Sequence, residues 1–241
     1  MSAEKQPGLV KLTGVITNYK VTRSTASFIF TDSDRNAMGV VAIAAAAVGL
    51  SGPAIATAST AANTEEEADY VEFDLDGQVV RGWVWRSPFK EGEKVEAVVE
   101  WRGDHYETAG IARPSDRVIA LYPHCSRGRT KHIRNAVKWW LIGTTLMVAL
   151  LLLARIATLP IELAFRGLLE EGAFVILGFY LFFGLMAFRL ALRWMPFVRL
   201  TEKVFRTLGK SSPSNVDLVK STKAQRKPDD PGELGTFYFR Y

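Results

Sequence analysis

Two long apolar runs dominate the hydrophobic pattern of this chain, near residues 139–159 and 172–194. Each is close to the ~20 apolar residues with which an α-helix crosses the hydrocarbon core of a bilayer. Backbone polar groups in that core must be paired within the segment, so a long apolar run without partner strands must be helical. The pattern therefore predicts a transmembrane helical hairpin over residues 136–194, and a buried helical pair in a soluble protein is the alternative.

A pattern of period two occupies residues 63–135. Apolar residues at positions 71, 73 and 75 alternate with acidic residues at 72 and 74, and Asp76-Gly77 then gives a strong tight-hairpin signal. Further strand-like runs, separated by turn residues, lie at 78–85, 94–101, 105–112 and 118–122. Short strands at this spacing predict a small antiparallel sheet or partly closed barrel. The expected fold class is thus an α+β membrane protein with a helical hairpin and a small β domain.

Residues 1–36 contain two strand-like stretches, 9–16 and 27–31, with Gly14 and Asn18 as interruptions. Residues 37–62 are rich in Ala and Gly, carry no charge and are broken at 49–53, so that each half is too short to span a bilayer. A single crossing would place the strands before and after it on opposite sides of the membrane. A re-entrant hairpin lets them share one sheet and is the preferred interpretation, with a single span as the alternative.

The charge pattern supports a membrane rather than a nucleic acid as the partner. The chain of 241 residues has a mean hydropathy of +0.06 and a formal net charge of +5, and its basic residues gather beside the apolar runs. Such clusters bind anionic headgroups. The candidate headgroup residues are Arg127, Arg129, Lys131, Arg134, Lys138, Arg193, Arg199, Lys203 and Arg206.

Orientation follows from the same residues, because Lys and Arg resist translocation. Both outer flanks of the hairpin are basic, whereas the link at 160–171 carries three glutamates against Arg166. The hairpin is therefore expected to enter from the cytoplasm and return there, with the soluble parts mainly cytoplasmic. The expected interface anchors are Trp139, Trp140 and Trp194.

The C-terminal segment, 195–241, is divided by composition. Residues 195–209 predict an amphipathic helix that lies on the membrane surface. Residues 211–232 are polar and contain three prolines, which predicts a flexible linker, and the chain ends in an aromatic cluster at 237–241.

Candidate chemistry is sparse. His124, Cys125 and His132 offer three ligands at a spacing unlike that of zinc sites, which use about four. The bland interpretation is that this stretch caps the β domain, although the nearby cations allow a lowered pKa at Cys125 and a reactive or acylated thiol. Arg102-Gly103-Asp104 lies where a hairpin turn is expected. With no catalytic constellation in view, we predict no enzyme activity, no cofactor and no metal.

Four distinctive stretches, at 82–89, 118–128, 194–200 and 235–241, carry a resemblance that extends over nearly the whole chain. Together they resemble a family of proteobacterial membrane proteins known as type VI secretion system effectors. The resemblance implies a multi-pass protein of the bacterial inner membrane. It also implies a role in interbacterial competition, with the secretion apparatus or a cognate effector or immunity protein as partner.

Two functions follow as expectations. The first is a membrane-acting effector, which the resemblance and the marginal segment 37–62 favour. The alternative is a resident inner-membrane protein, either an immunity protein or a scaffold with a cytoplasmic β domain, which the strong hydrophobicity of the hairpin favours. The oligomeric state stays open.

Overall fold

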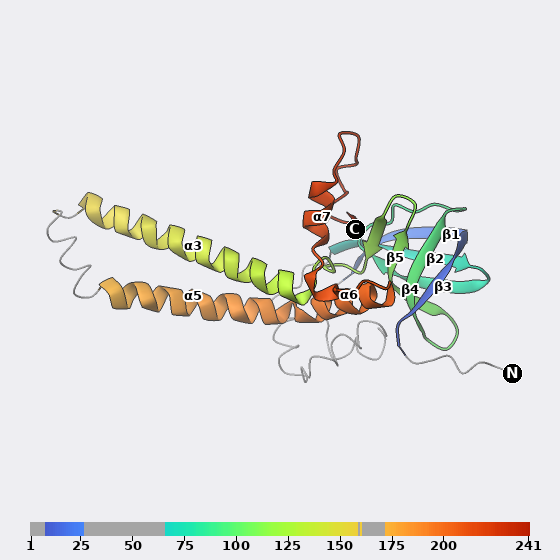
Figure 1. Ribbon diagram of the computed structural model, residues 1–241, viewed down its shortest axis with the longest axis horizontal. Helices are drawn as coiled ribbons and strands as arrows, with labels where there is room; N and C mark the ends of the chain where they lie inside the picture. The colour runs from blue at the N-terminus through green and yellow to red at the C-terminus, as the bar shows by residue number, and fades with distance from the viewer. Residues whose placement is uncertain (1–7, 27–65, 159, 161–171) are drawn as a thin grey trace. The chain divides into compact units, whose positions relative to one another are not determined.

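The computed structural model describes residues 8–26, 66–158, 160 and 172–241 (Figure 1). It divides into two compact units, which are named here by their content. The barrel unit comprises Met1–Arg129 and Met195–Tyr241, and the helical unit comprises Thr130–Trp194. All of the described strands lie in the barrel unit and the two longest helices lie in the helical unit, which confirms the predicted α+β class. The residues on both sides of the hairpin in sequence belong to the same unit.

Five strands of the barrel unit close into a barrel. They are β1 (Val10–Ala26), β2 (Glu66–Leu75), β3 (Gln78–Val84), β4 (Lys94–Trp101) and β5 (Tyr106–Arg113). Antiparallel pairing gives the order β3-β2-β1-β4-β5, and a parallel pairing of β3 with β5 closes the ring. The closing pairs join Val80 and Arg81 of β3 to Tyr106 and Glu107 of β5. This is the five-stranded Greek-key architecture of OB-fold barrels, and an architecture by itself assigns no function.

The period-two pattern is confirmed in β2. Val71, Phe73 and Leu75 are buried in the barrel interior, and the acidic residues between them are half-buried on the outer side. The predicted tight turn after β2 is also confirmed, because Asp76 and Gly77 have φ angles of 48° and 79°. A two-residue hairpin that follows the strand twist needs positive φ at both positions, and Asp-Gly supplies it at low cost.

β1 is longer than the sequence indicated. Gly14 and Asn18 do not end it, and the strand continues for 17 residues. A register shift between Thr17 and Lys20, with φ of 53° at Asn18, marks a bulge that bends the strand. Its first part pairs with β4 and its second part with β2. The strand expected at 27–31 and the apolar segment 37–62 lie outside the described residues.

Two further strands extend the sheet beyond the barrel. β6 (Val118–Leu121) pairs with β5, and β7 (Phe239–Arg240) pairs with β6. The aromatic chain end is therefore part of the fold. The ring of Phe237 lies 5.4 Å from that of Trp85, and Lys210 lies over the ring of Tyr241.

The amphipathic helix predicted after the hairpin is α6 (Met195–Thr207), but protein covers its apolar face. Phe197, Leu200, Val204 and Phe205 are buried within the barrel unit. A Cβ placed on Gly110 of β5 would lie 3.6 Å from Val204, so the helix packs on this strand. This corrects the predicted membrane-surface helix. An amphipathic stripe fits a lipid surface and a sheet equally well, and here the sheet occupies it.

The segment predicted as a flexible linker contains ordered elements, η3 (Pro213–Asn215) and α7 (Leu218–Ala224). Backbone hydrogen bonds join it to the chain before the hairpin, from the Gly128 N–H to the Val216 carbonyl and from the Leu218 N–H to that of Ser126. Asp217 caps α7 by accepting from the Lys220 N–H at 3.1 Å. The polar composition of residues 211–232 gives no indication of these hydrogen bonds to distant residues.

The helical unit contains all of α3 (Arg129–Thr158) except its first residue, and α5 (Ala173–Arg193). With a rise of 1.5 Å per residue, their 30 and 21 residues give lengths of about 45 and 32 Å. Thr145 Oγ1 lies 2.7 Å from Tyr180 Oη, and His132 Nε2 lies 3.1 Å from the Ala191 carbonyl oxygen. The later contact on α3 is made by the earlier residue on α5, so the two helices are antiparallel and form a hairpin. The acidic residues of the link lie outside the described residues.

Candidate membrane interface

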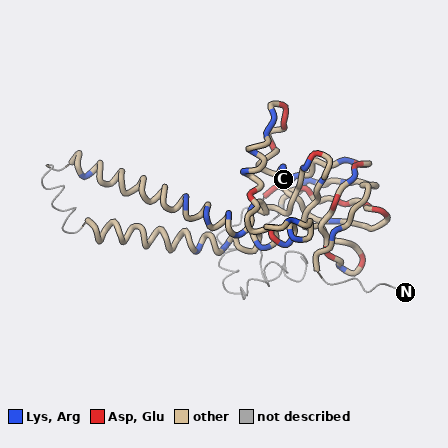
Figure 2. The backbone as a smooth tube through the Cα atoms, in the orientation of Figure 1, with Lys and Arg blue, Asp and Glu red and all other residues tan. Residues whose placement is uncertain are grey.

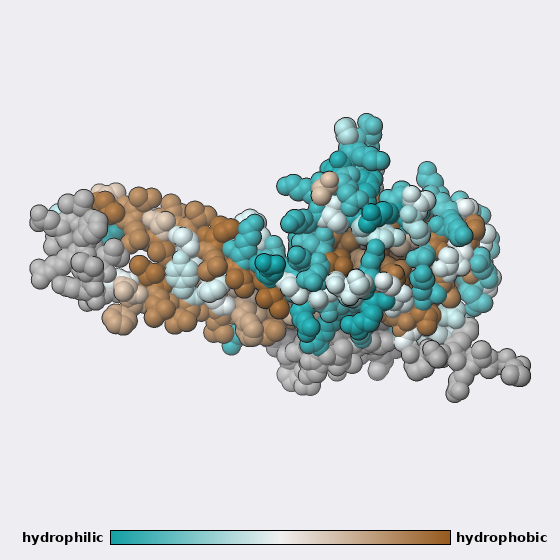
Figure 3. Space-filling model, viewed as in Figure 1, coloured by the Kyte–Doolittle hydropathy of each residue, from teal (hydrophilic) through white to brown (hydrophobic). Residues whose placement is uncertain are grey.

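The two helices expose nearly all of their apolar side chains. Thr144 is the one buried residue of α3, and α5 has none. Phe174 is 78% exposed and Leu150 is 65% exposed. Figure 3 shows the surface of both helices as predominantly hydrophobic. Soluble proteins rarely leave so large a continuous apolar surface uncovered, so this surface indicates a membrane or another protein as its partner. By length and composition, both helices are apolar enough to span a membrane.

All of the charged side chains among the described residues of the helical unit are basic. Figure 2 shows no acidic residue along α3 or α5, and several basic ones near the start of α3 and the end of α5. Of the predicted headgroup residues, Arg134 and Lys138 are exposed, and Lys131 and Arg193 are half-buried. Arg155 lies in the last turn of α3, at the opposite end of that helix from Lys131 and Arg134.

The remaining predicted headgroup residues belong to the barrel unit. Arg127 forms an ion pair with Asp217, with 3.3 Å between Nε and Oδ1. The backbone N–H of Arg129 donates to Glu202 Oε1 at 2.7 Å, while its side chain is exposed. The structure thus gives Arg127 a structural partner that the sequence did not reveal.

Three of these cations share one stripe of α6. Arg199 and Lys203 are half-buried and Arg206 is exposed, at positions i, i+4 and i+7. Burial lowers the pKa of Lys203, and the nearby Glu100 carboxylate acts in the opposite direction. The apolar face of this helix is buried in protein, so only this basic side remains for an anionic partner.

The three predicted anchors occupy different environments. Trp139 is 61% exposed, with Lys138 Nζ 5.8 Å from its ring centroid. Trp140 instead turns toward α5, where its ring lies 6.2 Å from that of Tyr180 and where a Cβ on Gly184 would lie 3.1 Å from the indole. Trp140 therefore packs against the facing helix, whereas most of the Trp139 side chain is exposed. Trp194 is half-buried at the junction of α5 and α6.

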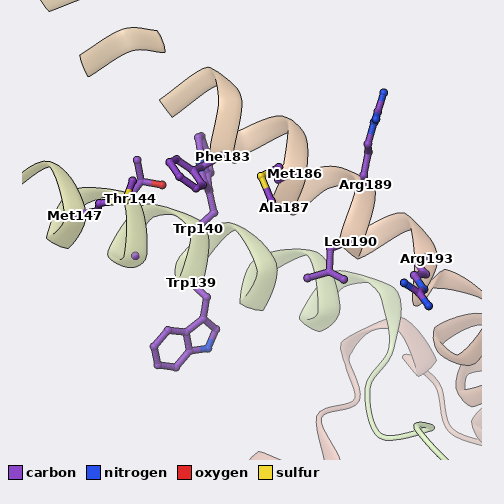
Figure 4. Close-up of a pocket in the computed structure, with 11 residues that line it drawn as sticks. Trp139, Trp140, Thr144, Met147, Phe183, Met186, Ala187, Arg189, Leu190 and Arg193 are labelled. Atoms are coloured by element: carbon purple, nitrogen blue, oxygen red, sulfur yellow. The ribbon is translucent and has the colours of Figure 1, made fainter. Parts of the chain in front are cut away.

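A groove of about 670 Å³ runs between the two helices (Figure 4). Small residues of both helices line it, namely Gly143, Thr144 and Ala187, together with the larger Met147 and Phe183. Arg189 and Arg193 line its other end. This groove was not visible in the sequence, because the facing positions become neighbours only when the helices pair.

The candidate thiol and metal residues have separate partners. His124 Nε2 lies 3.0 Å from Glu66 Oε2, with the ring against Trp85 and Phe197, whereas His132 contacts the backbone of α5. The Cys125 thiol is buried and donates to the Phe197 carbonyl at 3.4 Å. Burial raises its pKa to about 12, which is opposite to the lowering that the nearby cations suggested. Among the described residues, no group of three or more His, Cys, Asp or Glu side chains is placed to hold a metal.

A buried charge network, also missed from the sequence, joins the ends of β1 and β2. Asp69 is 2% exposed and accepts hydrogen bonds from Arg23 Nε and from the Ser87 N–H, each at 2.9 Å. Arg86 lies 3.6 Å from the same carboxylate and also pairs with Glu67. A buried charge left unpaired is strongly unfavourable. The network therefore stabilises the pairing of Arg23 in β1 with Asp69 in β2, close to the strand ends that flank residues 27–65.

Comparisons with protein-family models, with curated proteins and with solved structures found no match to this chain.

Proposed function

We propose that this chain is an integral membrane protein whose α3–α5 hairpin crosses the bilayer. The observation that carries the proposal is the exposure of the apolar side chains on both helices. Helices of about 45 and 32 Å reach across a hydrocarbon core of ~30 Å, and the longer one leaves its basic first turns outside that core. Lipid would then replace water as the solvent of this surface.

The pairing of β6 with β7 supports a crossing that returns to its starting side. Ile119, before the hairpin, pairs with Phe239, after it. Two strands of one sheet lie on one side of a membrane, so the chain between them must cross an even number of times. The basic flanks support the proposal that this side is the cytoplasm of a bacterium and that the hairpin lies in the inner membrane.

The same reasoning applies to the apolar segment 37–62. Ala26 at the end of β1 pairs with Glu66 at the start of β2. A single crossing would carry these two residues to opposite faces of the membrane. The pairing therefore favours re-entry, or no entry, over one full span, and the segment itself lies outside the described residues.

For the biological role we propose a membrane-acting effector of type VI secretion in interbacterial competition. The support is the resemblance carried by the four stretches named above. In this role the hairpin inserts into the inner membrane of a target cell and disturbs it. The secretion apparatus and a cognate immunity protein would be its partners.

A resident inner-membrane protein, acting as immunity protein or scaffold, is the second candidate. The observation that favours it is the barrel unit, whose sheet needs chain from both sides of the hairpin. A protein built in this way can complete its soluble domain only after the hairpin has inserted and returned. This order of events suits insertion during synthesis, in the membrane of the producing cell.

Expression from a plasmid in a bacterial host separates these roles. Insertion is expected to keep the protein in the membrane fraction after alkaline extraction, and release into the soluble fraction would contradict the membrane proposal. Growth arrest with loss of membrane potential would support the effector. Harmless expression that protects against a neighbouring toxin-producing strain would support immunity, and harmless expression without protection would support a scaffold.

Orientation is tested by cysteine labelling in intact cells with a membrane-impermeant maleimide. The variants Asn63→Cys, Gly167→Cys and Ser211→Cys each add one thiol to a chain whose own Cys125 is buried. We expect external labelling at position 167 alone. Labelling at 211 would contradict the proposed orientation, and labelling at 63 would make the segment 37–62 a full crossing.

A further inference from the structure

We infer that the groove between α3 and α5 binds one anionic phospholipid, with its headgroup at Arg189 and Arg193 and an acyl chain along the apolar part. The inference rests on the proposed membrane insertion and adds a specific ligand to it. All of the lining residues belong to the helical unit.

The groove has a polar end and an apolar end. Figure 4 shows Arg189 and Arg193 at one end, with the Arg189 side chain extending away from α3, and Thr144 and Met147 toward the other end. Its volume of about 670 Å³ lies within the ~300–1,000 Å³ range of ligand sites. Small side chains open the middle of the groove, and flexible methionine adapts to an irregular apolar partner. The site therefore matches an amphipathic ligand with one elongated apolar part.

The position of Trp139 relates the groove to the membrane interface. Trp139 lines the groove between its two ends and is largely exposed, as is typical of indoles at the headgroup level (Figure 4). Arg189 and Arg193 lie on one side of it along the helices, and Thr144 and Met147 lie on the other. With Trp139 at the interface, the basic end of the groove faces the headgroups and the apolar end enters the hydrocarbon core.

Charge selects an anionic lipid over the other occupants. Arg189 is exposed, and the described residues of the helical unit contain no carboxylate to pair with it. A guanidinium binds phosphate through two parallel hydrogen bonds. A second copy of the helical unit would bring more cations to the same place, and like charges would oppose that contact. A phospholipid supplies both the anion and the chain.

The test uses the full-length protein in detergent, with phosphatidylglycerol and phosphatidylcholine added at equal concentrations and retained lipid counted by native mass spectrometry. We expect roughly tenfold preference for phosphatidylglycerol, as for one charge-assisted contact of about 1.4 kcal/mol. Arg189→Gln should abolish this preference, whereas Arg155→Gln, at the other end of α3, should keep it. Ala187→Phe fills the groove and should reduce retention of both lipids, whereas Gly178→Phe, where a Cβ meets nothing within 4 Å, should not.

Equal retention of both lipids by the unsubstituted protein would overturn the inference, as would unchanged preference in Arg189→Gln. A lipid-free dimer would show that a second copy occupies the groove and would also overturn it. These failures differ from failure of the proposed function, because they leave the protein resistant to alkaline extraction. Arg189→Gln leaves the lining volume nearly unchanged, so it remains informative if Ala187→Phe fails to fold.

Discussion

At Cys125, two effects act on the thiol in opposite directions. Cations at Arg127, Arg129 and Lys131 follow it closely in sequence and would favour a thiolate. Burial removes the thiol from water and raises its pKa to about 12, so burial is the larger effect. Sequence distance to a charge is therefore a poor guide to reactivity when the side chain points into a core.

We predict that Cys125 does not react with maleimide in the folded protein. With a pKa of about 12, roughly 10⁻⁴ of the thiol is ionised at pH 8. Labelling in detergent should be negligible over an hour and complete after unfolding in guanidinium chloride, as measured by intact mass. Rapid labelling of the folded protein would show that this part of the barrel unit opens readily.

Glu100 is a second residue whose burial decides its chemistry. Its side chain is 6% exposed, and its Oε2 has no hydrogen-bond partner among the described residues. Burial raises its pKa above the ordinary value near 4.5, while nearby Arg102 and Lys203 oppose the shift. The folded protein thus holds this proton more tightly than the unfolded chain does, so ionisation of Glu100 reduces stability.

We predict that Glu100→Gln stabilises the protein at neutral pH by up to about 1 kcal/mol, because it removes a buried charge while keeping the shape. The gain should shrink as the pH falls through the raised pKa, since Glu100 is then protonated in the folded state and is uncharged like glutamine. Thermal unfolding at pH 7.5 and pH 5 measures both effects. Glu96→Gln on the same strand, where Glu96 pairs with Lys11, is the matched control and should not stabilise. A loss of stability in Glu100→Gln at pH 7.5 would contradict the prediction.

At the scale of elements, the hairpin is held by close approach as well as by apolar contact. Gly184 of α5 faces the indole of Trp140, and a Cβ there would lie 3.1 Å from the ring. Between helices in lipid the hydrophobic effect does not drive association, and dispersion contacts are a main attractive force. Small residues strengthen these contacts because they let the helix backbones approach closely. A glycine at this position lets the helices meet.

We predict that Gly184→Val loosens the hairpin and destabilises it by about 1–3 kcal/mol through overpacking. Gly178→Val is the matched control, because a Cβ at Gly178 meets nothing within 4 Å. Both substitutions add the same atoms to the same helix. Thermal unfolding in detergent should separate the two variants, and equal stabilities would show that the contact with Trp140 does not hold the helices together.

α6 shows the same dependence on a packing partner. Phe205 is fully buried, and its neighbour Arg206 is exposed. We predict that Phe205→Ala costs about 3–5 kcal/mol, as is usual for a buried phenylalanine, whereas Arg206→Ala changes stability little. Equal effects in chemical unfolding of the two variants would restore the membrane-surface interpretation of this helix.

At the scale of the whole molecule, the chain leaves one folded unit and returns to it. Met1–Arg129 and Met195–Tyr241 build the barrel unit together, and Thr130–Trp194 is inserted between them. The Gly128–Val216 and Ser126–Leu218 backbone bonds join the two parts next to the insertion. The barrel unit therefore has its own core and does not need the helical unit for its sheet.

We predict that replacing residues 130–194 with a short Gly/Ser linker leaves a folded barrel unit that no longer sediments with membranes. Near-UV circular dichroism and cooperative unfolding would report the fold, and fractionation would report the location. A chain that ends at Arg129 lacks α6 and β7 and is expected to be degraded. If the linker variant stays in the membrane, then the hairpin is not the sole anchor and the segment 27–65 contributes.

Features that depend on neighbouring residues could be predicted from the amino-acid order alone. Lipid or water as solvent acts on each turn of a helix, so the apolar runs and their basic flanks were visible directly. The Asp76-Gly77 turn and the alternation in β2 were visible for the same reason, because backbone angles and the strand pleat are local.

What covers each apolar or polar face became visible in the folded chain and not before. The apolar stripe of α6 is the same whether lipid or β5 packs on it, and the thiol of Cys125 is the same whether it is wet or buried. Closure through β3 and β5, and the return of the chain end as β7, join residues far apart in sequence. Such pairings leave no local periodicity, because they depend on the free energy of the assembled sheet and not on any one segment.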